Sequence, residues 1–181
     1  TREHFRSVHG FDSPWDDFSG YYRSLERRGI AVNVMSMVGA GTLRMAVMGM
    51  EERPATPKEI ARMRMFYRHA KRDGGRHLSS GLEYVPGSYA SRGELAALAS
   101  EGGVYSTHMR NEDDHVLQAL EEAIWISRQA GVPLNVSHLK AQGHRNWRRL
   151  PEILDAISAG RESGMTITCD RYPFEAYFSR I

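Results

Sequence analysis

The chain has 181 residues, of which 41% are hydrophobic and 25% are charged, a composition typical of one globular domain. Lys and Arg number 24 against 22 Asp and Glu, so a net charge of +2 gives no electrostatic basis for binding nucleic acid or an anionic membrane. The single cysteine, Cys169, excludes an intrachain disulfide framework and a zinc site made of several thiolates. No apolar run approaches the ~20 residues that span a bilayer, so we expect a cytoplasmic protein.

The predicted elements alternate between strands and helices. Residues 1–28, rich in aromatic and charged side chains, are interpreted as a helical lead-in that ends near Gly29, and residues 29–181 as one α/β unit. The expected strands are Ala31–Val38, His77–Tyr84, Val104–His108, Pro133–Leu139 and Met165–Asp170. The expected helices are Pro57–Asp73, Arg92–Ser100, Asp114–Ala130 and Trp147–Ser163. Such alternation predicts a parallel sheet, in either a barrel or a doubly wound open sheet.

Local signals support the helix boundaries. The segments Thr56–Glu59 and Ser91–Glu94 both read as capping boxes, and the first also has a Pro at the first helical position. Apolar residues recur at helical spacing within the longer helices, which predicts one face packed on the sheet rather than a cofactor site. The residues of these two stripes are Ile60, Met63, Phe66 and Ala70, then Leu117, Leu120, Ile124 and Ser127.

Two histidines stand at equivalent positions in this pattern. His108 and His138 each close a predicted strand, and they are 30 residues apart, which is the length of one strand–helix–strand unit. In a parallel sheet they would therefore lie on adjacent strands at the same edge, where α/β proteins build their sites. Two neutral imidazoles placed there are suitable ligands for zinc or a similar ion. The alternative is that each is an isolated polar residue, hydrogen-bonded to a neighbour.

Other candidates carry weaker signals. Lys140 follows His138 by two residues, which predicts the same side of the strand and a contact with an anionic group, although it could equally be an exposed loop lysine. The run Asp170–Tyr172 could supply an acceptor or an anion clamp, or only a surface ion pair. Gly39-Ala40-Gly41 follows a strand, but Arg44 stands where a dinucleotide fingerprint needs Gly.

Several motifs taken together resemble the D-aminoacylase (N-acyl-D-amino-acid deacylase) family of metal-dependent amidohydrolases. The resemblance extends from about Trp15 to Tyr177. The segments that carry it are VGAGTLRMAVMG (38–49), RPATPKEIARMR (53–64), LSSGLEYVPGSYAS (78–91), GGVYSTHMRNE (102–112), AGVPLNVSHLKAQG (130–143) and CDRYPF (169–174).

The resemblance implies a (β/α)8 barrel, of which this chain would be an internal fragment covering about strands three to seven, with zinc at the carboxyl ends of the strands. It implies that His108 and His138 are the metal ligands from the fifth and sixth strands. It also implies that Tyr84, Lys140 and Tyr172 bind the N-acyl-D-amino acid, with Lys140 and Tyr172 near its carboxylate. The loop beside the metal would be shaped by Arg110, Asn111 and Glu112.

The implied activity is hydrolysis of the amide of N-acyl-D-amino acids. Family members also carry a His-x-His pair, a bridging Cys and a catalytic Asp on other strands, and no segment of this chain matches them. We therefore assign no catalytic residue here and expect the isolated chain to be inactive. The open edges of its outer strands could pair with another chain.

Three alternatives remain open. A catalytically incomplete or decayed amidohydrolase-like module is favoured by Ala40 where the family usually has His, by Arg76-His77, and by the short helix Arg92–Ser100. A dihydropyrimidinase-like activity is disfavoured by the GLEYVPGSYA segment and by the lack of a lysine suited to carbamylation. A doubly wound nucleotide-binding domain is disfavoured by the incomplete glycine motif.

Overall fold

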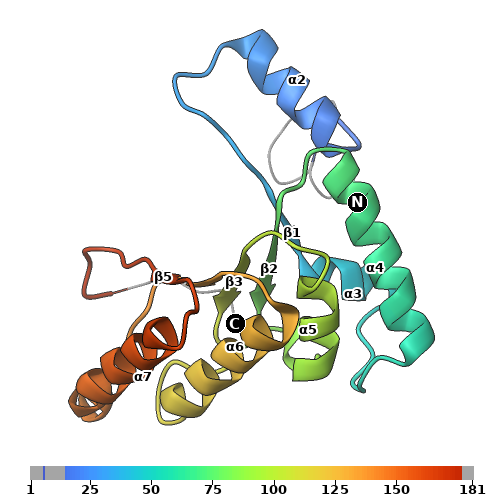
Figure 1. Cartoon of the computed structure of the whole chain (residues 1–181). Coiled ribbons are helices and arrows are strands. Elements are labelled where there is room, and N and C mark those ends of the chain that lie inside the picture. Colours follow the sequence, from blue (N-terminus) through green and yellow to red (C-terminus); the bar gives the residue numbers. More distant parts are fainter. Residues whose placement is uncertain (1–5, 7–14, 177–181) are drawn as a thin grey trace.

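A computed structural model of the chain describes residue 6 and residues 15–176, so most of the first half of the predicted lead-in lies outside the described residues. The described part forms one five-stranded parallel sheet in the order β1-β2-β3-β4-β5 (Figure 1). The strands are β1 (Met37–Gly39), β2 (His77–Gly81), β3 (Tyr105–His108), β4 (Leu134–Val136) and β5 (Ile167–Cys169). The predicted parallel α/β sheet is confirmed.

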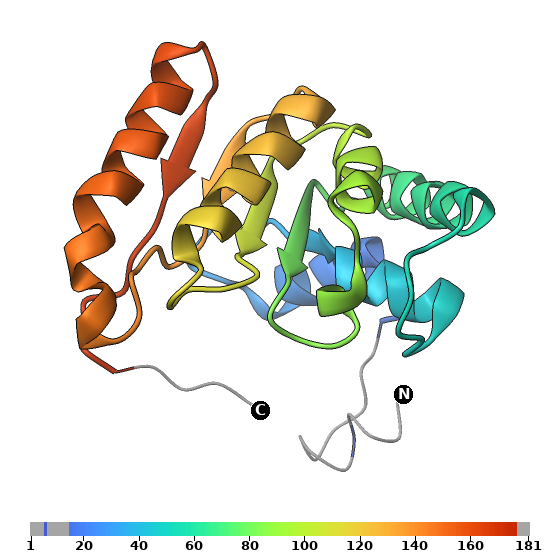
Figure 2. The ribbon, with the colours of Figure 1, turned by 90° about the horizontal axis from the view of Figure 1, so that it is seen from below.

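The helices follow the strands in the predicted alternation (Figure 2). They are α2 (Phe18–Arg28), α3 (Ala40–Met48), α4 (Pro57–Arg72), α5 (Arg92–Ala99), α6 (Val116–Ala130) and α7 (Leu150–Glu162), with 3-10 turns η1 (Gly87–Tyr89) and η2 (His144–Arg149). Every strand pairs with its neighbour in the sequence. A doubly wound sheet reverses its strand order at a switch point, whereas a barrel adds strands in one direction, so the topology favours the barrel alternative.

The hydrophobic core lies between the sheet and its helices. Leu78, Tyr105, Leu134 and Ile167 occupy one register across four strands and are all buried. The predicted helical stripes belong to this core. Met63 and Leu120 are fully buried in it, and the other apolar residues of the two stripes are partly buried against it. Because side chains alternate along a strand, the next register row points to the opposite face. That row is polar and hydrogen-bonded, through Ser106, Asn135 and Thr168.

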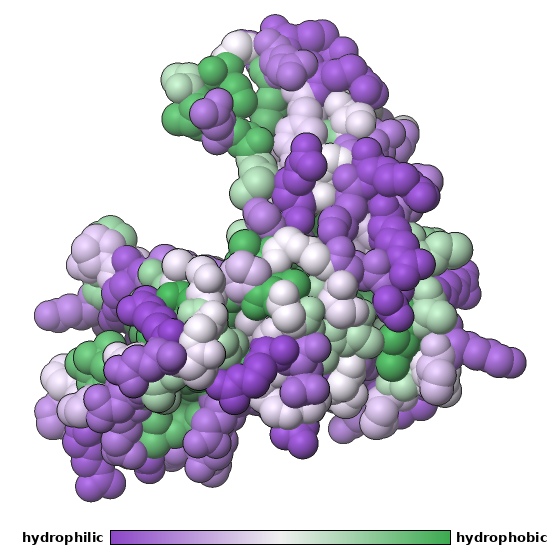
Figure 3. Space-filling model, viewed as in Figure 1, coloured by the Kyte–Doolittle hydropathy of each residue, from purple (hydrophilic) through white to green (hydrophobic). Residues whose placement is uncertain are grey.

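The segment before the sheet projects away from it (Figure 1). Helix α2 ends at Arg28, as predicted, and Tyr22 joins it to the sheet by accepting from Ser36 N at 2.9 Å. The predicted strand Ala31–Val38 is wrong for most of its length, because β2 begins only at His77 and offers residues 31–36 no strand to pair with. The exposed apolar side chains of this segment gather at the tip of the projection (Figure 3), and they are Ile30, Val32, Val34 and Met35.

Three further element predictions need correction. Strand β2 ends at Gly81, so Tyr84 lies in the following turn, and β4 ends at Val136, so His138 lies beyond the strand. Helix α3 was not predicted, although its Leu43 and Met48 are buried in the core. Within the part of the chain that the structure describes, no helix has the length and apolar character needed to cross a membrane.

One buried ion pair joins helices α3 and α5. The Arg44 guanidinium donates to both carboxylate oxygens of Glu94, at 2.9 and 2.7 Å, and both side chains are only 1% exposed. The capping box predicted at Ser91 is therefore only half present. Ser91 Oγ accepts from Glu94 N at 3.1 Å, but the Glu94 carboxylate contacts Arg44 instead of the cap. At Thr56 both halves of the predicted capping box, with Glu59, are present.

Candidate metal centre

The two predicted metal ligands meet at one edge of the sheet. His108 is the last residue of β3, and His138 follows the end of β4, whose Val136 is in register with Thr107. His108 Nδ1 lies 3.0 Å from His138 Nε2, and the ring planes cross at 72°. The structure therefore brings together two imidazoles from adjacent strands, each with one nitrogen directed at the other.

The backbone at His138 is held in an unusual conformation. Its φ of 41° is the one positive value among the non-glycine residues that the structure describes. Such a conformation persists where the surroundings determine it. Here Asp170 Oδ1 accepts from the His138 backbone N–H at 2.7 Å, while Asp170 Oδ2 accepts from the Asn135 side chain at 3.0 Å. Asp170, a weak candidate in the sequence, thus holds the backbone from which the His138 side chain extends.

Each imidazole also faces a carboxylate through its other nitrogen. Glu83 Oε2 lies 2.8 Å from His108 Nε2, and Glu112 Oε1 lies 2.9 Å from His138 Nδ1. The Glu83 side chain is 45% exposed, whereas that of Glu112 is 1% exposed and also forms an ion pair with Lys140. Sequence reasoning gave Glu112 only a loop role and did not consider Glu83. Both glutamates lie in loops after strands, where no periodic signal marks the direction of a side chain.

The environment fits a divalent cation. Among the described residues, one group of three possible ligands has its donor atoms within 4.8 Å of one another, namely His108, Glu112 and His138. Burial lowers the pKa of His138 from its usual 6.5, and the charges of Lys140 and His108 lower it further, against the opposing effect of Glu112. The neutral imidazole that metal binding requires is thereby favoured. Neither buried oxygen of Glu112 makes an aligned hydrogen bond, although Lys140 and His138 lie within ion-pair distance of this carboxylate.

A pocket of about 360 Å³ opens beside the two histidines. It is lined by Tyr84, His108, His138, Lys140 and Tyr172, together with Phe174 and Ala176. All five residues predicted for metal or substrate binding therefore surround one cavity. Lys140 reaches it from the loop after β4 and not from the strand, so the alternation argument behind its predicted direction was wrong. Its Nζ lies 3.2 Å from His138 Nδ1 and 5.7 Å from the centre of the Tyr172 ring.

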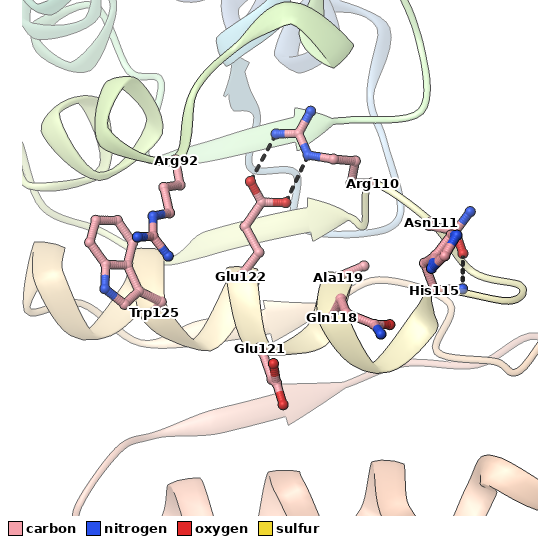
Figure 4. Close-up of a pocket in the computed structure, with 9 residues that line it drawn as sticks. All are labelled: Arg92, Arg110, Asn111, His115, Gln118, Ala119, Glu121, Glu122 and Trp125. Carbon is pink, nitrogen blue, oxygen red and sulfur yellow. Dashed lines mark hydrogen bonds and ion pairs between the residues drawn. The ribbon is translucent and has the colours of Figure 1, made fainter.

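Arg110 and Asn111 do not face this pocket. Arg110 pairs with Glu122 of α6 through two hydrogen bonds of 2.8 and 2.9 Å (Figure 4). It also donates to two carbonyl groups before α5. Asn111 Oδ1 accepts from the His115 backbone N–H at 2.8 Å. The 540 Å³ cavity that both residues line is a separate one beside α6. Their expected role next to the metal is therefore indirect. Their hydrogen bonds hold the loop that follows His108 in place.

Comparison with known proteins identifies relatives in sequence and in fold. No protein-family model matches the chain. A D-aminoacylase of Alcaligenes xylosoxydans xylosoxydans is 38% identical over 166 residues, which are 90% of this chain and 34% of that enzyme. Among solved structures, an N-acyl-D-glutamate deacylase of Bordetella bronchiseptica in complex with zinc and a phosphonate inhibitor has a TM-score of 0.81 and 33% identity, covering 87% of this chain and 34% of that one.

A D-aminoacylase structure described as defining a novel subset of amidohydrolases gives a TM-score of 0.80 and 39% identity over the same shares. The fold thus matches part of the α/β amidohydrolase domain of these enzymes. The predicted resemblance is confirmed, because the chain is homologous to D-aminoacylases and N-acyl-D-amino-acid deacylases. It spans about a third of the length of the relatives it matches.

Proposed function

We propose that this chain is the part of a zinc-dependent amidohydrolase that supplies two metal ligands and a substrate pocket for N-acyl-D-amino acids. The observation that carries the proposal is the 3.0 Å approach of His108 Nδ1 to His138 Nε2 at the rim of a pocket that also holds Lys140. The names of the homologous deacylases and the zinc in one of their structures support the choice of reaction and metal.

The residues of the chain have distinct roles in this proposal. His108 and His138 would hold the zinc ion, which when bound supplies Lewis acidity toward the amide carbonyl and toward water. Lys140 would bind the carboxylate of the substrate as a point charge, with Tyr172 beside it. Tyr84, whose ring centre lies 4.9 Å from that of His108, would form the wall of the pocket nearest the metal.

The chain would not complete the reaction alone. Stable zinc sites use three or four protein ligands, and two histidines leave the ion short of that number. The sequence differences that favoured a decayed module leave the fold intact: Ala40 is a buried core residue of α3, and the short helix α5 still packs against α6. We therefore prefer an amidohydrolase segment to a decayed module.

A chimeric enzyme tests this function. The homologous third of the Alcaligenes D-aminoacylase would be replaced by this chain, and release of D-methionine from N-acetyl-D-methionine would be measured together with zinc content. We expect activity that His138→Ala abolishes, while the exposed His144→Ala variant, in the turn before α7, serves as the matched control. A folded, zinc-loaded chimera that releases no D-amino acid would contradict the proposal.

A further inference from the structure

We propose that Asp170 is a positioning residue of the candidate metal centre: its carboxylate holds the backbone of His138 in the conformation that directs the imidazole at His108. The inference deepens the proposed function and rests on it for the use that is made of the two imidazoles. The hydrogen bonds of Asp170, however, belong to this chain whether or not a metal ion is bound. They can therefore be tested separately.

The backbone conformation of His138 determines where its ring lies. With a φ of 41°, His138 is in the left-handed region, which a residue with a Cβ adopts only where its surroundings determine it. Because the rotamers open to a side chain depend on φ and ψ, a change of φ here would turn the imidazole away from His108. Whatever fixes the His138 backbone therefore also fixes the 3.0 Å approach of Nε2 to His108 Nδ1.

Asp170 contacts this turn through its backbone and through its side chain. Its N–H donates to Val136 O at 3.2 Å, and its carbonyl accepts from Leu139 N at 2.9 Å. The contact at His138 itself comes from the side chain, since Asp170 Oδ1 accepts from His138 N at 2.7 Å. Removal of the carboxylate thus takes away the contact at His138 and leaves the two flanking backbone hydrogen bonds in place.

A network on the polar face of the sheet holds the second carboxylate oxygen. Asn135 Nδ2 donates to Asp170 Oδ2 at 3.0 Å and also to Ser106 Oγ at 3.2 Å. Asn135 Oδ1 accepts from Thr168 Oγ1 at 2.8 Å, which sets the orientation of the amide. Asp170 is exposed, but with both oxygens accepting from N–H groups its direction is fixed. The aim of the carboxylate therefore depends on Asn135.

The alternative is that Asp170 binds the metal ion itself. Among the residues that the structure describes, Asp170 is outside the one group of possible ligands whose donor atoms lie within 4.8 Å of one another. Its oxygens are directed at the backbone of a proposed ligand and at the Asn135 amide instead. Partners that orient the ligands affect metal affinity without touching the ion, and the structure supports this role for Asp170.

The test measures the proximity of the two imidazoles and the zinc affinity of the 181-residue chain in parallel. In the metal-free chain, a nuclear Overhauser cross-peak should connect ring protons of His108 and His138. Asp170→Ala should abolish this cross-peak and lower zinc affinity, in competition with a chelator, roughly 10- to 100-fold. A merely structural role would lower the midpoint of urea unfolding without removing the cross-peak from the folded chain.

An exchange of the two paired side chains gives a matched control. Alone, Asp170→Asn sets two amide NH2 groups against each other and Asn135→Asp sets two carboxylates against each other, so both should lose zinc affinity. Together they restore one donor and one acceptor, and the introduced amide oxygen can still accept from His138 N. The double variant should therefore recover most of the affinity and the cross-peak. Asp155→Ala removes an exposed carboxylate from α7 and should change neither readout.

The outcomes separate the inference from the proposed function. Retention of either the cross-peak or the zinc affinity in folded Asp170→Ala would overturn the inference, and so would a double variant that is no better than the single ones. If Asp170→Ala does not fold, the exchange series decides by the same two readouts. Absence of zinc binding by the unsubstituted chain would instead contradict the proposed metal centre, and the cross-peak would still decide the role of Asp170.

Discussion

His108 Nδ1 and His138 Nε2 lie 3.0 Å apart, although 30 residues of the sequence separate them. The approach results from topology, since β3 and β4 are parallel neighbours and both histidines follow at their carboxyl ends. The outer nitrogens face Glu83 and Glu112. The site therefore has two inner nitrogens available to a cation and two carboxylates outside them.

The stability of the metal-free chain should depend on pH through His138. Burial lowers the pKa of this group below 6.5, so in acid the unfolded chain binds a proton more readily than the folded chain. Its contribution to the free energy of unfolding is therefore greatest above pH 6.5 and is lost as the pH falls toward the folded pKa. Urea unfolding at several pH values, with chelator present, should show this slope, and His138→Gln should reduce it. Equal slopes in the two proteins would contradict the assignment.

Breaking the buried pair of Arg44 and Glu94 should destabilise the fold strongly. Glu94→Gln leaves a buried guanidinium without its counter-charge, and we expect a loss of about 3–5 kcal/mol in the free energy of unfolding. Replacing both partners, in Arg44→Met with Glu94→Leu, should cost less than Glu94→Gln alone. As a control, Glu51→Gln removes a carboxylate that is 58% exposed, and it should cost about 0–1 kcal/mol. Equal effects of Glu94→Gln and Glu51→Gln in urea unfolding would refute this account.

The outer strands of the described sheet, β1 and β5, should promote self-association. Each has one neighbouring strand, so its other side presents backbone groups that can pair with a second chain. Met37→Lys places a charge on β1 and should shift association to higher protein concentration in sedimentation velocity. Met45→Lys, at a similarly exposed position on α3, should not. The prediction fails if the two variants associate alike.

Replacing Lys140 should weaken substrate binding more than zinc binding. In the chimeric enzyme, Lys140→Met should raise KM for N-acetyl-D-methionine by about tenfold or more, because the substrate carboxylate loses its counter-charge. Zinc content should change little, since Lys140 is a neighbour of a proposed ligand and not a ligand. A parallel loss of zinc and of substrate affinity would contradict this division of roles.

The sequence predicted the parts of the fold that depend on periodicity. The helical stripe containing Met63 and the histidines at the ends of β3 and β4 follow from spacing alone. The extent of the strands could not be predicted in this way. Residues 31–36 have the composition of a strand but no neighbouring strand to pair with. Pairing is a property of the whole sheet and not of one segment.

The partners of three buried or site-lining carboxylates, Glu94, Glu112 and Glu83, were also beyond sequence reasoning. Glu94 was assigned to a capping box because it stands three residues after Ser91, yet Arg44, fifty residues away, takes its side chain. Glu112 and Glu83 reach the histidines from loops, where direction depends on tertiary contacts. Local spacing identifies residues at strand ends, but it does not identify the partners that orient them.

Zinc binding by the 181-residue chain tests the central claim most directly. Zinc per chain would be measured by competition with a coloured chelator for the unsubstituted chain and for His108→Ala, His138→Ala and the matched control His144→Ala. We predict weak binding of about one zinc ion, lost in either of the first two variants and retained in the third. Unchanged zinc binding in His108→Ala or in His138→Ala would contradict the account.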